Sequence, residues 1–140
     1  ELKRGLDIAN KYDNVFDMRG DFYKIYNGTG IAYAQSWANE VVTKAFAVFK
    51  VTKGNASDAI IGAVNFGRDT DCLAAIAGGL AGALSGIETV KQEWIDQVDS
   101  AVKLNKYTNS QRTLKETADG LYQAILARVE KAKNWISLIE

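Results

Sequence analysis

The stretch that decides the fold is residues 64–86, VNFGRDTDCLAAIAGGLAGALSG. Its second half is rich in Ala, Gly and Leu, and small residues recur there every fourth position: Ala74, Gly78, Gly82 and Gly86. This spacing places a column of small side chains on one helix face, so that neighbouring backbones can approach closely. A glycine inside a helix costs roughly 1 kcal/mol relative to alanine, which tight packing has to offset. The pattern predicts a central packing helix from about Asp69 to Leu84.

Two carboxylates, Asp69 and Asp71, stand where this helix begins. One interpretation is structural, because an aspartate at the N-cap or in the first turn meets free N–H groups and the positive end of the helix dipole. The other is functional, because two carboxylates on a rigid helix offer hard oxygen ligands to Mg²⁺. Residues two apart point to nearly opposite sides of a helix, so both can reach one ion, or two adjacent ions, only if Asp69 has non-helical dihedrals.

The residues beside these acids carry further alternatives. Arg68 is expected to be either the charge partner of Asp69 or Asp71, or a fork that binds a phosphate or diphosphate oxygen. Thr70, between the two acids, is expected to donate to a ligand or to position one. The sequence alone does not choose between the two roles of Arg68.

The rest of the chain also predicts helices, since it contains no proline and its apolar residues recur at spacings of three and four. We therefore expect an all-α, multi-helix bundle in a single domain over residues 1–140. Asn55 is expected to cap one helix, Thr113 and Glu116 form a capping box for the last, and Trp37 is expected on the buried face of a long third helix. The expected helices span about 2–9, 15–26, 31–51, 56–66, 69–84, 87–103 and 113–135.

Composition excludes several classes of function. Seventeen basic residues balance seventeen acidic ones, so no overall field attracts nucleic acid. The chain has no histidine and one cysteine, which excludes Ser-His-Asp catalysis, histidine-bearing zinc sites and Cys-x-x-Cys motifs. The longest uncharged run, Cys72 to Ile87, is shorter than the roughly 20 residues that span a bilayer. We expect a protein without nucleic-acid or membrane partners, in the cytoplasm.

The segment NFGRDTDCLAAIAGGLAGAL, preceded by ANEVVTKAFAVF and followed by TLKETADGLYQAIL, resembles the ADP-ribosylglycohydrolase family, which includes crystallin J1. The resemblance runs from about Ala32 to Leu126, and its sharpest element is Gly-x-Asp-Ser/Thr-Asp at the start of an Ala/Gly-rich helix. It implies an all-α fold, a pair of Mg²⁺ ions, and hydrolysis of the glycosidic bond between ADP-ribose and an acceptor. By position, Asp69 and Asp71 correspond to metal carboxylates of the family.

Three departures from the family pattern stand out. Cys72 replaces a Thr or Ser that also contacts metal in many members, and a thiol is a poor ligand for Mg²⁺, so either another oxygen serves or that contact is absent. Arg68 replaces a frequent second glycine. The family's N-terminal Gly-Asp-Ala-x-Gly and Thr-Asp-Asp motifs have no counterpart, and the chain opens without methionine. We expect the C-terminal portion of a longer domain, which associates with its N-terminal half or with itself.

Two further ligand-binding predictions concern Tyr33 and the residues just before Arg68. Tyr33 is expected either in the core or beside the nucleotide, where the family places an aromatic residue. The break formed by Asn65, Phe66 and Gly67 is expected either to be a plain helix end or to offer backbone groups to a ribose.

Three hypotheses about function remain at this stage. The first is a Mg²⁺-dependent hydrolase of ADP-ribosylated proteins or small molecules. The second is a non-catalytic, crystallin-like binding or structural protein, and the third is an inactive fragment.

Overall fold

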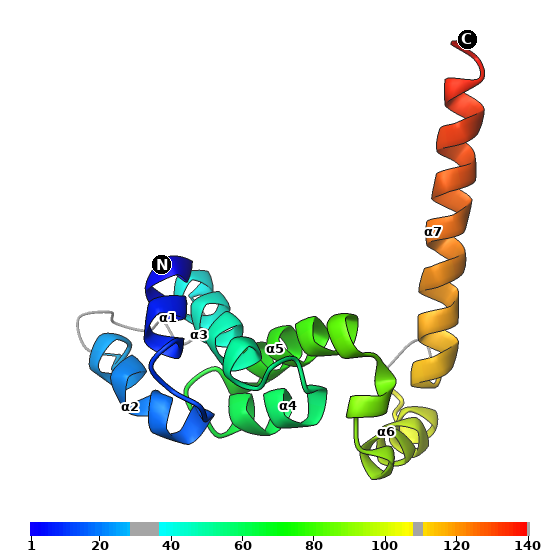
Figure 1. Cartoon of the computed structure of the whole chain (residues 1–140). Helices are drawn as coiled ribbons and strands as arrows, with labels where there is room; N and C mark the ends of the chain where they lie inside the picture. Colours follow the sequence, from blue (N-terminus) through cyan, green and yellow to red (C-terminus); the bar gives the residue numbers. More distant parts are fainter. Residues whose placement is uncertain (29–36, 108–110, 140) are drawn as a thin grey trace. The chain divides into compact units, whose positions relative to one another are not determined.

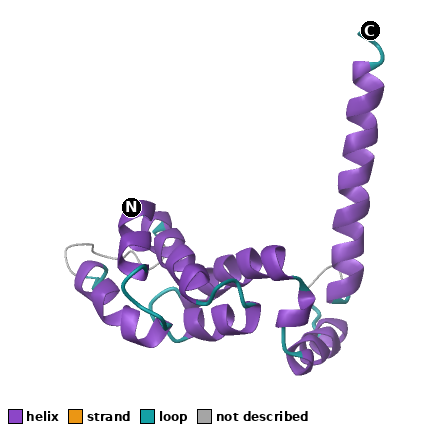
Figure 2. Ribbon diagram, viewed as in Figure 1, coloured by secondary structure: helices purple, strands orange, loops and turns teal. Residues whose placement is uncertain are grey.

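The computed structural model describes residues 1–28, 37–107 and 111–139. All regular secondary structure in these ranges is helical, comprising seven α-helices and one short 3-10 helix (Figure 2). The all-α prediction is confirmed. Among the described residues, no helix combines the length and the apolar character that crossing a membrane requires.

The contacts within the chain form two compact units, residues 1–91 and 92–140, and each is described by itself. The expectation of one domain over residues 1–140 stays a prediction. The helices of the first unit, labelled in Figure 1, are α1 (Leu2–Ala9), α2 (Val15–Ile25), α3 (Ala38–Val51), α4 (Ala56–Val64), α5 (Thr70–Ser85) and the 3-10 helix η1 (Ile87–Thr89).

Helix α5 is central to the first unit because it packs against both α3 and α4, while α1 lies on α3. The core between these helices contains large side chains with at most 1% of their surface exposed, including Met18, Phe22, Phe66 and Leu73. Phe22 of α2 meets Phe66 edge to face, with ring centroids 5.3 Å apart. This contact ties α2 to the turn that leads into α5.

The buried face of α5 differs from the predicted one. The fully buried residues are Leu73, Ala77 and Ala81, not the column of small residues that starts at Ala74. Of that column, Gly78 does allow a close approach, since an added Cβ would lie 2.8 Å from Ile60 Cγ1 of α4. Gly86 instead ends the helix, with φ of 76°. Small residues recur at four-residue spacing on more than one side of this helix. The sequence of the helix alone therefore does not show which side packs against α3 and α4.

The third helix also corrects an expectation. Its described part begins at Ala38, and Trp37 is the N-cap residue in an extended conformation. Because it precedes the first helical turn, Trp37 does not share the helix's buried face, and 51% of its surface is exposed. The prediction that Trp37 is buried was wrong.

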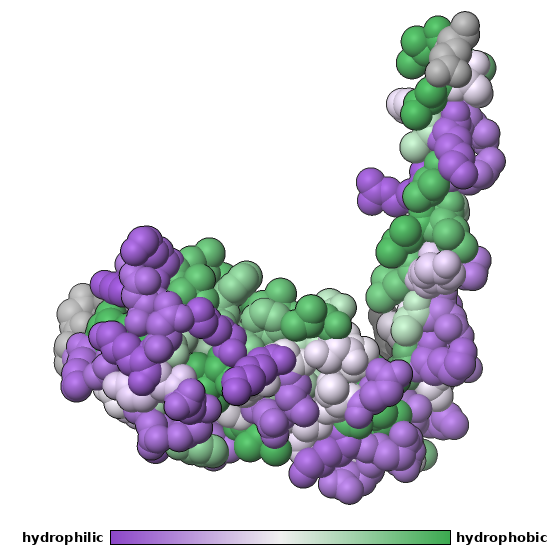
Figure 3. All heavy atoms as spheres, in the orientation of Figure 1, coloured by the Kyte–Doolittle hydropathy of each residue, from purple (hydrophilic) through white to green (hydrophobic). Residues whose placement is uncertain are grey.

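The second unit contains α6 (Gln92–Leu104) and α7 (Leu114–Ile136). The capping box of Thr113 and Glu116 is present, as predicted, and Asp99 of α6 accepts a hydrogen bond of 2.8 Å from the Leu114 N–H. No residue of α6 or α7 is buried among those described. Figure 3 shows hydrophobic residues gathered along one side of α7; they include Leu114, Leu121, Ile125, Val129 and Ile136, each at least 41% exposed.

Two glycine-to-alanine substitutions test the packing of the first unit in opposite directions. At Gly5, an added Cβ would overlap Thr43 Cγ2 and lie 3.1 Å from the Thr43 carbonyl oxygen, so α1 and α3 would have to separate. We expect Gly5→Ala to lower the free energy of unfolding by about 1–3 kcal/mol. At Gly79, no described atom lies within 4 Å of an added Cβ, and Gly79→Ala should raise stability by about 0.5–1 kcal/mol. Denaturant titration measures both, and effects of the same sign would contradict the described packing.

Candidate metal centre at the start of α5

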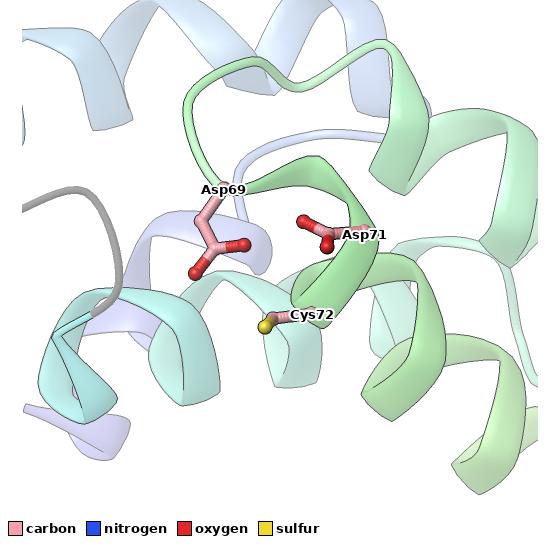
Figure 4. Close-up of side chains that lie close together, drawn as sticks. All are labelled: Asp69, Asp71 and Cys72. Carbon is pink, nitrogen blue, oxygen red and sulfur yellow. The ribbon is translucent and has the colours of Figure 1, made fainter. Parts of the chain in front are cut away.

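The start of α5 brings three potential metal ligands together. One carboxylate oxygen of Asp69, one of Asp71 and the Cys72 sulfur all lie within 4.8 Å of one another. Figure 4 shows Asp69 on the chain entering α5 and the other two side chains on its first turn. The convergence of Asp69 and Asp71 depends on a non-helical Asp69, which has φ of −79° and ψ of 76°.

Asp69 occupies the N-cap position without acting as a side-chain cap. Its carboxylate makes no capping hydrogen bond with the described backbone of α5. Three other polar N-cap side chains behave differently, because Asn14, Asn55 and Thr113 each accept a hydrogen bond from the backbone N–H three residues later. Glu1, the N-cap residue of α1, makes no such bond either. The capping interpretation therefore explains the position of Asp69 in the sequence but not the direction of its side chain.

The donor set suits a hard cation only in part. Mg²⁺ prefers oxygen ligands, which Asp69 and Asp71 supply, and takes about six of them in near-octahedral geometry. The Cys72 thiol is exposed, and its pKa is raised by its hydrogen bond with Asp69, by burial and by the charges of Asp69 and Asp71. A protonated thiol is a poor ligand. The two carboxylates fit a magnesium-like ion, whereas Cys72 does not.

Arg68 forms an ion pair that sequence analysis did not predict. Its Nε donates to Glu40 Oε1 of α3 at 2.6 Å. Lys44, one turn further along α3, donates to the same oxygen at 2.6 Å. In this three-residue ion cluster, Glu40, Lys44 and Arg68, the first two residues are 3% and 1% exposed and thus almost wholly removed from water, whereas the Arg68 side chain is 19% exposed. Removing one partner of such a cluster costs about 3–5 kcal/mol, because a buried charge is left uncompensated.

Aromatic rings complete the surroundings of Lys44. Its Nζ lies 5.4 Å from the ring centroid of Phe66, 5.6 Å from that of Tyr26 and 5.9 Å from that of Tyr23. Burial lowers the pKa of Lys44, the Arg68 charge lowers it further, and Glu40 opposes both effects. Cation-π contacts hold the ammonium group in place.

The turn between α4 and α5 contains two consecutive residues in the left-handed region. Gly67 has φ of 88° and Arg68 has φ of 65°. Glycine is required at position 67, where an added Cβ would lie 2.5 Å from Tyr23 Oη. At Arg68 the same conformation costs roughly 1–2 kcal/mol, since an L-residue with a Cβ disfavours it. The conformation at Arg68 is thus strained and has to be held by its contacts.

The other predicted ligand-binding residues lie at both ends of this turn. Asn65 is the C-cap residue of α4, and its side-chain amide donates to the Ile61 carbonyl at 2.9 Å. Thr70 is the first residue of α5, and its backbone N–H donates to the Arg68 carbonyl at 3.0 Å. Tyr33 lies outside the described residues. Asn65, Gly67, Arg68 and Thr70 thus lie in or directly beside the turn that leads to Asp69 and Asp71.

Sequence reasoning missed Glu40 and Lys44, although a signal was present. The two residues are four positions apart on α3 and share a face with the buried Ala47 and Val51. A charged pair on an otherwise apolar face is the pattern of a buried ion pair. Its third member, Arg68, is 28 positions from Glu40, and nothing in the local sequence joins them.

A cavity of about 340 Å³ lies elsewhere in the first unit. It is lined by residues from the start of α2, the end of α3 and α4, among them Asp13, Phe16, Lys53 and Asp58, and by none of the three clustered ligands. The candidate metal centre therefore stands apart from this cavity.

Comparison with models of protein families identifies the family to which the chain belongs. The model of the ADP-ribosylglycohydrolase family matches residues 3–130, which is most of the chain. The chain belongs to the ADP-ribosylglycohydrolase family, and the resemblance based on the segment around Asp69 and Asp71 is confirmed. The match begins well before Ala32, where the sequence resemblance was placed. No curated protein and no solved structure matches the chain significantly.

The lowered pKa of Lys44 predicts a pH dependence of stability. Between its lowered pKa in the folded state and the ordinary lysine pKa of about 10.4, Lys44 binds fewer protons in the folded state than in the unfolded state, so its contribution to stability rises with pH across this window. We expect the difference in unfolding free energy between the native chain and Lys44→Met to shift in favour of the native chain as the pH rises from about 7 toward 10. Denaturant titrations at several pH values measure this difference, and a constant difference would contradict the described burial.

Proposed function

We propose that this protein takes part in the Mg²⁺-dependent hydrolysis of the glycosidic bond of ADP-ribosylated substrates. In this proposal Asp69 and Asp71 are metal ligands, and the complete site holds two Mg²⁺ ions. The observation that carries it is the convergence of the two carboxylates, one of which occupies an N-cap position without capping its helix. Membership of the family supports the reaction type.

Each residue of the site then has a defined task. Asp69 and Asp71 would hold the Mg²⁺ ion, which when bound would supply Lewis-acid chemistry for orienting the ribose and activating or placing water. Thr70 lies between the two carboxylates in the sequence. Arg68, whose Nε donates to Glu40, is kept as a proposed contact to a diphosphate oxygen. Gly67, Asn65 and Tyr33 are kept as proposed ligand contacts, and Cys72 is not proposed as a ligand.

We further propose that residues 1–140 are the C-terminal portion of a longer ADP-ribosylglycohydrolase-like domain. Two carboxylates supply only a minority of the about six ligands that Mg²⁺ takes. The apolar stripe of α7 is exposed, and so are Ala75, Gly79 and Ala83 on α5. Helices that carry such faces are usually covered by other helices. An N-terminal half of the domain is the proposed cover and the proposed source of the remaining ligands.

The second candidate function is non-catalytic binding or a structural role, as in the crystallin J1 branch. Cys72 favours it, because a thiol stands where a metal-contacting hydroxyl is expected. This alternative predicts affinity for ADP-ribose without turnover. A cytoplasmic location also stays a prediction.

Calorimetric titration of Mg²⁺ and then ADP-ribose into the chain tests the proposed ligands. We expect Asp69→Asn and Asp71→Asn each to weaken Mg²⁺ binding at least about tenfold, because each removes a charged oxygen ligand. The heat of ADP-ribose binding should depend on Mg²⁺ and should disappear when a chelator is added. Asp58→Asn is the matched control, since Asp58 also lies in the first turn of a helix but outside the cluster.

Equal Mg²⁺ affinity in the native chain and Asp69→Asn would contradict the assignment. In the longer domain, the same substitution should abolish Mg²⁺-dependent release of ADP-ribose. Retained release would exclude Asp69 from the reaction.

The exposed apolar stripe of α7 predicts that the chain self-associates when the proposed N-terminal half of the domain is not present. We expect size-exclusion chromatography with light scattering to give a mass above the 15.3 kDa of one chain, rising with concentration. Leu121→Glu combined with Ile125→Glu should shift the mass toward one chain, because both substitutions place charge in the stripe. Lys115→Glu, a charge change at an exposed residue of the same helix, is the control. A native chain of constant single-chain mass would contradict the prediction.

A further inference from the structure

We propose that Glu40 is a positioning residue for the candidate metal centre. Acting through Arg68, it holds the turn before α5 in the conformation that directs the Asp69 carboxylate toward Asp71 and away from the N–H groups of its own helix. The inference rests on the proposed function in that Asp69 is taken as a metal ligand. The conformational effect itself can be measured without a metal.

The chain contains a second helix entry that serves as a comparison. Helix α4 is also preceded by two consecutive left-handed residues, Lys53 with φ of 53° and Gly54 with φ of 77°. The next residue, Asn55, has ψ of 119° and accepts a capping hydrogen bond of 3.0 Å from a backbone N–H of α4. Asp69 follows a similar pair but has ψ of 76° and does not cap. Since both side chains are good caps, other contacts have to account for the difference. The Cys72 thiol of α5 hydrogen-bonds Asp69, and further contacts outside the helix hold the turn before Asp69.

Those contacts begin with Glu40. The Arg68 side chain extends from the strained residue to Glu40 on α3, where Nε and Oε1 are 2.6 Å apart. Lys44 binds the same oxygen at 2.6 Å, and the rings around its Nζ fix Lys44 in turn. Glu40 is thus a buried anchor with little freedom to move. The ion pair therefore holds Arg68, the residue directly before Asp69, in a fixed position.

Two further contacts hold the turn on its other side. Tyr23 donates to the Phe66 carbonyl at 2.6 Å, and Arg19 donates to the Asn65 carbonyl at 2.9 Å. Both donors come from α2, so the start of the turn is fixed to α2 and its end to α3. Of these contacts of the turn, the ion pair with Glu40 is made by the residue directly before Asp69, so its loss should affect Asp69 most.

A purely electrostatic role of Arg68 predicts the opposite effect on cation binding. Arg68 is a positive charge next to the proposed cation site, so removing it would tighten Mg²⁺ binding if charge alone mattered. Removing the positioning contact instead releases Asp69 into the capping conformation and weakens Mg²⁺ binding. The two roles can therefore be separated by the sign of a single change in affinity.

The test is Arg68→Gly, because glycine accepts the left-handed conformation and leaves the Glu40–Lys44 pair intact. We expect about tenfold weaker binding of Mg²⁺ alone by calorimetry, the usual effect of losing a contact that orients a ligand. We also expect slower amide hydrogen exchange at Asp71 and Cys72, whose N–H groups a capping Asp69 would bind. Lys53→Gly is the matched control, as it removes a cationic left-handed residue before α4, and it should change neither readout.

Glu40→Gln should reproduce both changes, and where this variant does not fold, Arg68→Gly decides. Weaker Mg²⁺ binding together with slower exchange supports the proposal. Unchanged exchange, or Mg²⁺ binding that is unchanged or tighter, overturns it. If the native chain alone shows no Mg²⁺ binding, the proposed function is tested in the longer domain, and the exchange measurement by itself decides whether Glu40 positions Asp69.

Discussion

The interaction on which the site depends is the buried carboxylate of Glu40, shared by Lys44 and Arg68 at 2.6 Å each. Burying charge is costly unless it is paired, so these three residues constrain one another strongly. Lys44 connects Glu40 to the aromatic rings of α2 and its C-cap, and Arg68 connects Glu40 to the turn before α5. The core of the first unit and the geometry of the candidate metal centre therefore depend on the same contact.

The exposed apolar surfaces of the two units fit the proposal that the chain associates with a further half of the domain or with itself. Helix α5 uses Leu73, Ala77 and Ala81 inside the first unit and leaves its opposite apolar face exposed, while α7 exposes its whole apolar stripe. In the part of the chain that the structure describes, two carboxylates converge at the start of α5. Exposed apolar faces and an incomplete set of metal ligands are expected together if the remainder of one domain covers those faces and supplies the missing ligands.

Local signals predicted most of the helices. Apolar periodicity located them, and Asn55 and Thr113 marked two of their starts, because both features arise within a few residues of one another. The position of Asp69 and Asp71 was predictable for the same reason. The face that α5 buries and the exposure of Trp37 were not, since both depend on neighbours. The pairing of Glu40 with Arg68 across 28 positions lies beyond any local pattern.

The measurement that tests the central claim most directly is anomalous diffraction from crystals of the chain grown with Mn²⁺, which accepts the same oxygen ligands as Mg²⁺. An ion coordinated by both Asp69 and Asp71, with Arg68 still paired to Glu40, is the predicted result. An Asp69 carboxylate that caps α5, with no ion at the two aspartates, would contradict the assignment of this turn as a metal centre.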